Sequence, residues 1–144
     1  MRKLSAVLVL VLGATACGHT APGSGSTEAL CSPSYAPREL VDRGPLYTPP
    51  GRTSGETRTT DVAAIKKIAA AACALPTPPD DIACTLELGP SFELRFLDTQ
   101  GRTTTLTAES YGCQFVEGLG SRRFNAKPLW EALTAAGLPA PRPR

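Results

Sequence analysis

The sequence is poor in the residues that enzymes most often use for catalysis. Its single histidine, His19, lies in the small polar stretch Gly18–Thr27, so neither a Ser-His nor a Cys-His nucleophile is expected. Its five cysteines include no Cys-x-x-Cys pair, which argues against a thiol redox site. Adjacent acidic residues occur only at Asp80-Asp81, where the preceding prolines favour a turn over a metal site. We therefore expect no metal, no cofactor and no enzymatic activity.

The sequence also lacks an excess of basic charge. It contains 15 Lys and Arg and 13 Asp and Glu. Residues 1–16 hold Arg2 and Lys3 and no acid, so the remainder carries 13 residues of each sign and is formally neutral. Such a chain has no electrostatic footprint for nucleic acid, and no nucleic-acid partner is predicted.

No apolar run approaches the roughly 20 residues that a membrane-spanning helix requires. The longest, Leu4–Gly13, follows Met1-Arg2-Lys3 and precedes the small residues Ala14-Thr15-Ala16. A short basic start, an apolar stretch of this length and a small-residue ending are typical of an export signal. Residues 1–16 are therefore predicted to be a signal peptide.

The residues around Cys17 allow two interpretations of that signal. Ala14-Thr15-Ala16 fits an ordinary A-x-A cleavage site, whereas the same residues followed by Cys17 fit a lipobox, although Ala14 stands where leucine is preferred. Cysteine parity favours lipidation, because a lipid on the Cys17 sulfur leaves four cysteines that can form two disulfides. Residues 17–30 are then expected to be a lipidated cysteine and a flexible tether to the cell membrane.

Two helices are predicted within a single domain over residues 31–138. Asp61 is a suitable N-cap for a helix that ends near Leu75-Pro76. A second helix begins near Lys127, has Pro128 in its first turn and ends at Gly137. Apolar residues fall on one face of each helix, namely Val62, Ile65, Ile68, Ala69 and Ala72 in the first and Leu129, Trp130 and Leu133 in the second.

The clearest strand signal is a hairpin, in which residues 91–98 and 102–109 flank the loop Thr99-Gln100-Gly101. Setting Asp98 opposite Arg102 places Leu94 against Leu106 and gives the hairpin one apolar face. Weaker signals predict short strands at residues 38–41, 56–60 and 114–118, a loop at Leu46–Gly55 and a disordered tail at residues 139–144.

A sheet with one apolar face needs a cover, and two amphipathic helices can supply it. The predicted fold class is therefore α+β: a small antiparallel sheet with two helices packed on one face, stabilised by disulfides. The hairpin register brings Cys84 near Cys113, which leaves Cys31 to pair with Cys73. The pairing of Cys73 with Cys84 across the proline-rich loop stays open as an alternative.

Two further features are candidate surfaces, and the aromatic residues are not. Arg122-Arg123 beside glycines could hold an anion, although solvated arginines are the simpler interpretation. Glu87, Glu93 and Glu109 lie around the hairpin and could supply paired carboxylates only if two of them share a cleft. Phe92, Phe96, Phe115 and Trp130 are expected in the core.

Residues 60–120 and 128–138 resemble a group of small exported proteins and lipoproteins of actinobacteria. The resemblance rests on Asp61 opening a helix, Ala74-Leu75-Pro76, Cys84, the hairpin with Leu94-Arg95-Phe96, Gly112-Cys113, and a closing helix with Trp130. It implies an extracytoplasmic location, a disulfide-linked α+β fold and a Cys84–Cys113 link, but no activity.

The leading hypothesis is a non-enzymatic lipoprotein of the cell envelope, anchored through Cys17 on the extracytoplasmic face of the membrane and binding an envelope protein or a cell-wall component. The alternative is a small secreted inhibitor of an extracellular hydrolase that uses Leu46–Gly55 as a rigid bait. An enzyme built on the glutamates is the third hypothesis.

Overall fold

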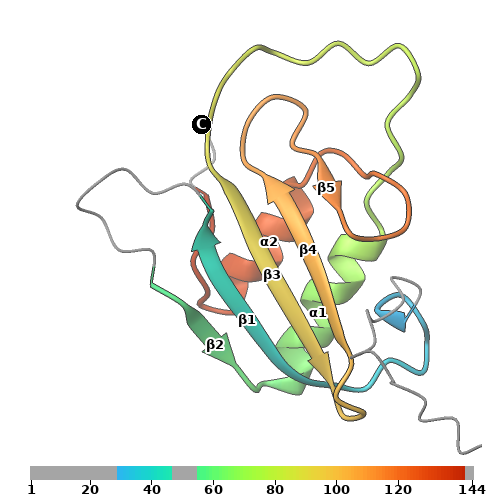
Figure 1. The fold of residues 1–144 in the computed structure, drawn as a ribbon, viewed down its shortest axis with the longest axis vertical. Coiled ribbons are helices and arrows are strands. Elements are labelled where there is room, and N and C mark those ends of the chain that lie inside the picture. Colours follow the sequence, from blue (N-terminus) through green and yellow to red (C-terminus); the bar gives the residue numbers. More distant parts are fainter. Residues whose placement is uncertain (1–28, 47–54, 142–144) are drawn as a thin grey trace, which may run out of the picture.

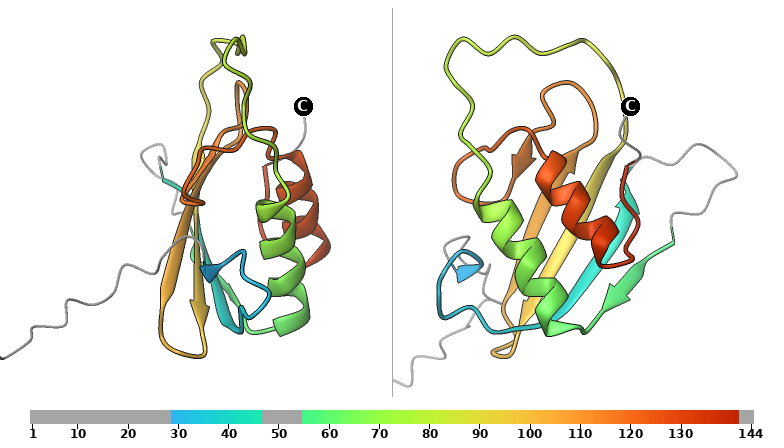
Figure 2. Two further views of the ribbon diagram at one scale, coloured as in Figure 1. Left: turned by 90° about the vertical axis from the view of Figure 1, so that its right-hand side faces the viewer. Right: turned by 180° about the vertical axis from the view of Figure 1, so that it is seen from behind.

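The computed structural model describes residues 29–46 and 55–141. Within them a five-stranded antiparallel sheet, in the order β2-β1-β3-β4-β5, is covered on one face by two helices. Figure 2 shows both helices on the same side of the sheet, with the other face open. This is the α+β architecture that the sequence predicts.

The helices begin and end where their capping residues indicate. Helix α1 (Val62–Cys73) starts at Asp61, whose side chain accepts hydrogen bonds from the backbone N–H groups of Ala63 and Ala64. Helix α2 (Lys127–Ala135) has Pro128 in its first turn and ends before Gly137, which has φ of 71°. Four of the five residues predicted for the apolar face of α1 are buried. Val62 is the exception, because in the first turn it lies beyond the edge of the core and is 46% exposed.

The central hairpin of β3 (Ser91–Asp98) and β4 (Thr103–Glu109) has the predicted register. Leu94 pairs with Leu106 and Phe92 with Ala108, and these residues are buried beneath the helices. Asp98 fixes the turn, since its carboxylate accepts from the N–H groups of Gln100 and Arg102 and from Arg102 Nε at 2.6 Å. The alternation of buried and partly buried residues along β3 therefore determines which face the helices cover.

The first strand is longer and more central than the sequence predicts. Strand β1 (Pro37–Pro45) lies between the hairpin and the edge strand β2 (Thr57–Thr59), whereas only residues 38–41 were expected to be extended. Its prolines and glycine obscure the strand pattern, and the register shifts between Pro37 and Glu39 and between Asp42 and Pro45 accommodate them. Strand β5 (Val116–Glu117) forms the other edge.

The core extends slightly beyond the predicted domain limits. Leu30 is 2% exposed and belongs to the core, and Ala140 packs against it after the buried Leu138. The remaining residues of the predicted tether, signal peptide and tail (1–28 and 142–144) lie outside the described residues, as does most of the predicted loop at Leu46–Gly55.

Two disulfides join consecutive cysteines along the chain. Cys31 is bonded to Cys73 at the end of α1, and Cys84 is bonded to Cys113 after β4, with Cα–Cα distances of 5.6 and 5.1 Å. These are the two pairs that the sequence favours. Disulfides persist in oxidising compartments, so they indicate an extracytoplasmic environment. In the part of the chain that the structure describes, no helix is long and apolar enough to cross a membrane.

Candidate functional site

The long connection between α1 and β3 carries the most exposed apolar side chains of the described residues. Leu86 is 99% exposed and Leu88 is 90% exposed. Figure 1 shows this connection as an arch that stands away from one end of the sheet. Single exposed leucines are common, but two almost fully exposed leucines at positions i and i+2 form a pattern that needs an explanation.

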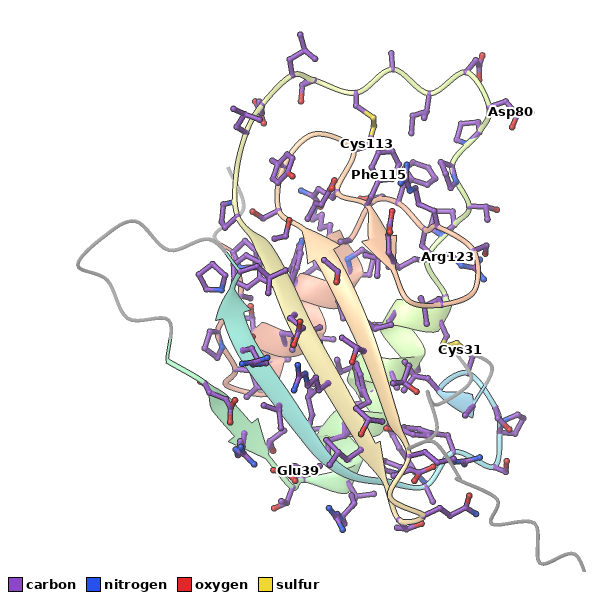
Figure 3. The ribbon with its side chains drawn as sticks, viewed as in Figure 1. Cys31, Glu39, Asp80, Cys113, Phe115 and Arg123 are labelled. Atoms are coloured by element: carbon purple, nitrogen blue, oxygen red, sulfur yellow. A yellow bond between two sulfur atoms is a disulfide. The ribbon has the colours of Figure 1, made fainter. Side chains whose placement is uncertain are left out.

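The last part of this arch, residues 84–90, is fixed at both ends to the loop that follows β4. At one end lies the Cys84–Cys113 disulfide, visible in Figure 3 beside the Cys113 label. At the other, the Pro90 carbonyl accepts from the Ser110 N–H at 3.3 Å and from Ser110 Oγ at 2.8 Å. We call residues 85–89, which lie between these attachments, the presented segment.

The backbone of the presented segment is unpaired. Residues 85–89 make no backbone hydrogen bond to any other described residue. In an extended chain alternate side chains point to opposite sides, so Leu86 and Leu88 share one side and Glu87 takes the other. Glu87 is exposed and lies at the edge of a cavity. The segment therefore offers two apolar side chains together with free backbone donors and acceptors.

The cavity behind the presented segment has a volume of about 690 Å³. Helix α2 supplies one wall with Lys127, Trp130, Glu131 and Thr134, and the loop after β4 supplies the other with Tyr111, Gly112 and Gln114. This volume lies within the range of small-molecule sites.

Two strained residues shape this cavity. Gln114, with φ of 51°, and Asn125, with φ of 58°, are the non-glycine residues with positive φ in the described ranges, and both line it. Hydrogen bonds hold them there, from Gln114 N to the Tyr111 carbonyl at 2.8 Å and from Asn125 N to the Cys113 carbonyl at 3.0 Å. Residues kept in a sparsely populated conformation cluster at binding and catalytic sites, because the surrounding structure must maintain them.

The same cavity lining contains two buried polar atoms without partners. Gln114 Oε1 and Trp130 Nε1 are both inaccessible and make no hydrogen bond within the protein. The Trp130 ring is positioned by an edge-to-face contact with Phe92, at 5.4 Å between ring centroids. An unpaired buried polar group costs about 1–3 kcal/mol, so two of them in one lining are significant.

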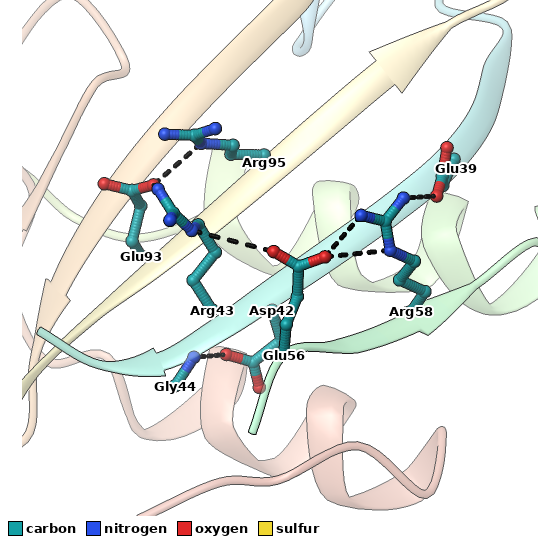
Figure 4. Close-up of polar contacts among 8 residues, drawn as sticks. All are labelled: Glu39, Asp42, Arg43, Gly44, Glu56, Arg58, Glu93 and Arg95. Atoms are coloured by element: carbon teal, nitrogen blue, oxygen red, sulfur yellow. Dashed lines mark hydrogen bonds and ion pairs between the residues drawn. The ribbon is translucent and has the colours of Figure 1, made fainter. Parts of the chain in front are cut away.

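The open face of the sheet carries a network of ion pairs instead of a cavity (Figure 4). Arg58 bridges Glu39 and Glu56, while Glu93 accepts from Arg43 at 3.3 Å and from Arg95 at 2.7 Å. These pairs are largely solvated, so each contributes little to stability. Positive and negative groups neutralise one another, so this face has no excess charge with which to attract a charged ligand.

Asp42 and Tyr35 are buried polar side chains that lie away from this cavity. Burial raises the pKa of Asp42, which is 1% exposed, and a hydrogen bond from the Gly44 N–H at 2.7 Å offsets this only in part, while Asp42 Oδ2 has no partner. Burial, and then the negative charge of Asp98, raise the pKa of Tyr35 to about 12. Asp42 lines neither this cavity nor a second, smaller one of about 250 Å³, which Tyr35 borders together with Ser32 and Lys66. Both side chains are buried, and we assign both to the core.

The structure separates most of the candidate site residues. Arg122 donates to Glu117 and lies over the Phe115 ring at 4.9 Å, and Arg123 donates to the Leu75 carbonyl, so these arginines do not form an anion site. The prediction that Phe115 is a core residue is also wrong, because its ring lies under Arg122 and is only partly buried.

The three glutamates do not share a cavity. Glu87 lines the cavity on the helix side of the sheet, Glu93 lies in the ion-pair network of the open face, and Glu109 is on the same face as Glu93. Asp80-Asp81 forms an exposed turn, and no group of three or more His, Cys, Asp and Glu side chains in the described ranges could hold a metal ion. Cys17 and His19 lie outside the described residues.

Comparisons with known proteins add no family to these observations: no protein-family model, no curated protein and no solved structure matches the chain. The candidate site therefore rests on geometry alone. Sequence reasoning missed both the presented segment and Glu131, Gln114 and Asn125, because neither exposure nor positive φ is visible in a sequence. The one available signal was the alternation Thr85-Leu86-Glu87-Leu88 between Cys84 and Pro90.

Proposed function

We propose that this protein is a non-enzymatic lipoprotein of the cell envelope that binds a partner protein through the presented segment. The observation that carries the proposal is the exposure of Leu86 and Leu88 on an extended backbone that is unpaired and fixed at both ends. A strand of this kind can add to the edge of a partner's sheet, where main-chain hydrogen bonds give affinity and alternate side chains enter pockets. Attachment at both ends lowers the entropy lost on binding.

Cysteine pairing supports the membrane anchor. Cys31, Cys73, Cys84 and Cys113 pair among themselves, so Cys17 has no cysteine partner within the chain. A lipid on the Cys17 sulfur accounts for this odd cysteine and for the signal sequence before it. The extracytoplasmic environment indicated by the disulfides is the one in which such an anchor would hold the domain.

The presented segment also supports a second candidate function, inhibition of an extracellular hydrolase. Peptidases bind substrates as extended strands, and a strand held at both ends can occupy such a cleft without leaving it after cleavage. The segment Cys84–Pro90 is the part of the described chain with this geometry, and most of the predicted bait at Leu46–Gly55 lies outside the described residues. The two candidates share one interaction surface and differ in the partner.

Alanine substitutions in the presented segment test both candidates. A photocrosslinking residue at position 85 in cells that carry the full chain should capture a partner, and Leu86→Ala with Leu88→Ala should abolish the adduct. Full burial of each leucine is worth about 1.5–3 kcal/mol, and alanine removes only part of it, so each single variant should weaken binding about tenfold. Leu46→Ala, at a leucine that is 54% exposed outside the segment, is the matched control and should change nothing.

The inhibitor candidate predicts that the protein slows a secreted peptidase with an apolar specificity pocket, and that the inhibition constant rises about tenfold for Leu86→Ala but not for Leu46→Ala. A panel of such peptidases that is unaffected by the protein would exclude it. Equal adducts from the wild type and the double-leucine variant would overturn the proposal of binding through the segment.

The anchor is tested with Cys17→Ser. We expect the variant to be released from the membrane or left unprocessed, and the wild type to carry lipid mass on its mature N-terminus. Membrane retention of the variant, together with an unmodified wild-type N-terminus, would remove the lipoprotein assignment.

A further inference from the structure

We infer that the cavity between helix α2 and the loop Tyr111–Gln114 binds an uncharged saccharide. The inference concerns the helix side of the presented segment and does not depend on a partner for Leu86 and Leu88. It rests on three properties of the lining: its polar groups, the character of its apolar surface, and its charge.

The polar groups of the lining match a ligand that both donates and accepts hydrogen bonds. Thr134 contributes a hydroxyl and Gln114 an amide, whose Oε1 is buried and unpaired, as is Trp130 Nε1. Asn125 adds a second amide to the lining. Hydroxyl groups donate and accept at once, so a polyhydroxylated ligand matches this mixture better than a ligand that only donates or only accepts.

The apolar part of the lining consists of aromatic rings and small side chains. Tyr111 and Trp130 are accompanied only by Ala135 and Pro141, and no Leu, Ile, Val, Met or Phe lines the cavity. An acyl chain or the aliphatic side chain of a peptide would find no pocket of its own kind. The C–H face of a sugar ring packs flat on an aromatic ring, and its hydroxyl groups remain free to reach the polar rim. Tyr111, which is partly exposed, offers such a ring, whereas Trp130 is 6% exposed and forms the floor.

The charge of the lining excludes anionic ligands. It contains two carboxylates, Glu87 and Glu131, and one ammonium group, Lys127, whose Nζ lies 3.9 Å from Glu131 Oε1. Arg122 and Arg123 are absent from the lining, so a phosphate or a nucleotide would meet net negative charge. Carboxylates are strong acceptors for sugar hydroxyls, which need no counter-charge.

Trp130 is the only tryptophan of the chain, so its fluorescence reports directly on this cavity. The full chain, held in detergent micelles, would be titrated with N-acetylglucosamine oligomers, with β-glucan oligomers and with α-glucan oligomers. Inorganic phosphate and a leucine-rich peptide serve as the competing ligand classes. We expect at least one of the saccharides to shift the Trp130 emission saturably, and neither phosphate nor peptide to do so.

Two variants assign that response to the cavity. Glu131→Ala removes an exposed carboxylate from the lining and Gln114→Asn shortens the amide at a position where asparagine tolerates positive φ, and each should weaken saccharide binding about tenfold. Glu117→Ala, at an exposed glutamate that does not line the cavity, is the matched control and should bind as the wild type does.

Three results would overturn the inference. They are the absence of a response to every saccharide class, an equal or stronger response to phosphate or peptide, and equal weakening by Glu131→Ala and Glu117→Ala. Leu86→Ala with Leu88→Ala should leave saccharide binding unchanged, which separates this site from the partner surface.

Discussion

The two disulfides provide a matched test of whether the presented segment must be held to function. In the variant Cys84→Ser with Cys113→Ser, the segment loses one of its two attachments and keeps the hydrogen bonds at Pro90. In the variant Cys31→Ser with Cys73→Ser, the bond removed lies outside the segment, between the N-terminal turn and α1. A comparison of the two separates the loss of the tether from the loss of stability.

The stability costs of the two variants are expected to be almost equal. The bonds close loops of 29 and 42 residues, and the chain-entropy relation gives about 3.6 and about 3.9 kcal/mol. Domains of this size have unfolding free energies of about 5–15 kcal/mol, so both variants should remain folded near 15 °C, close to the temperature of maximum stability. Urea unfolding followed by the Trp130 fluorescence measures both costs.

The binding costs should differ. Fixing the backbone of one residue costs about 1–2 kcal/mol, so freeing even two residues of the presented segment lowers affinity by about 2 kcal/mol, or roughly 30-fold. Limited proteolysis gives a readout that needs no partner: the Cys84/Cys113 variant should be cut within residues 85–89 much faster than the Cys31/Cys73 variant. Equal cleavage rates and equal loss of binding in the two variants would refute the view that the disulfide holds the segment.

Three further predictions concern the scaffold. Asp42→Asn should raise the free energy of unfolding by about 1–2 kcal/mol at pH 7, because it removes a buried charge. Burial raises the pKa of Asp42, so the wild type is free of the cost of this charge below the unfolded pKa and acquires it as pH rises through the folded pKa. Urea titrations should therefore show the stability gain of the variant disappear near pH 3, and a pH-independent difference would contradict the assignment. Burial alone would raise the pKa of Asp98, but hydrogen bonds from Arg102 and Gln100 and the charge of Arg102 lower it. Asp98→Asn should therefore lower the free energy of unfolding by about 1–3 kcal/mol above the unfolded pKa, and this loss should fade as pH falls through the folded pKa in the same urea titration. Gly118→Ala should cost more than 2 kcal/mol in thermal unfolding, because its φ is +103° and a Cβ would lie 2.2 Å from the Thr105 carbonyl oxygen; Gly101→Ala, at φ of +78° with open space around it, is the control and should cost about 1 kcal/mol.

The hairpin and the helices could be predicted because local physics determines them. The alternation from Phe92 to Asp98 and the bulged turn at Gly101 fix the register, and Asp61 and Gly137 mark helix limits that follow from backbone hydrogen bonding. Strand β1 was underestimated, because Pro37 and Pro45 suppress the strand pattern and its place in the sheet comes from long-range pairing with β3.

The candidate sites were less accessible to sequence reasoning. The positive φ of Gln114 and Asn125 results from hydrogen bonds between segments that only the fold brings together. Leu86 and Leu88 are exposed because no other part of the described chain packs against them, and the composition of the sequence carries no information on such packing. Arg122 and Glu117 are five residues apart and form an ion pair across a turn. Arg122 is a candidate anion site in the sequence, but in the fold its charge is already paired.

The order of the cysteine pairs bears on how the protein acquires its covalent structure. The first of the four disulfide cysteines is bonded to the second and the third to the fourth, so neither loop encloses or crosses the other. For a chain that crosses a membrane N-terminus first, an oxidant that joins each newly arrived thiol to the one before it would produce the native bonds without an isomerase. A free thiol at Cys17 would disturb this order of bond formation, because Cys31 would form a disulfide with Cys17 before Cys73 emerged. Lipid on that sulfur would thus serve the correct oxidation of the domain as well as its attachment.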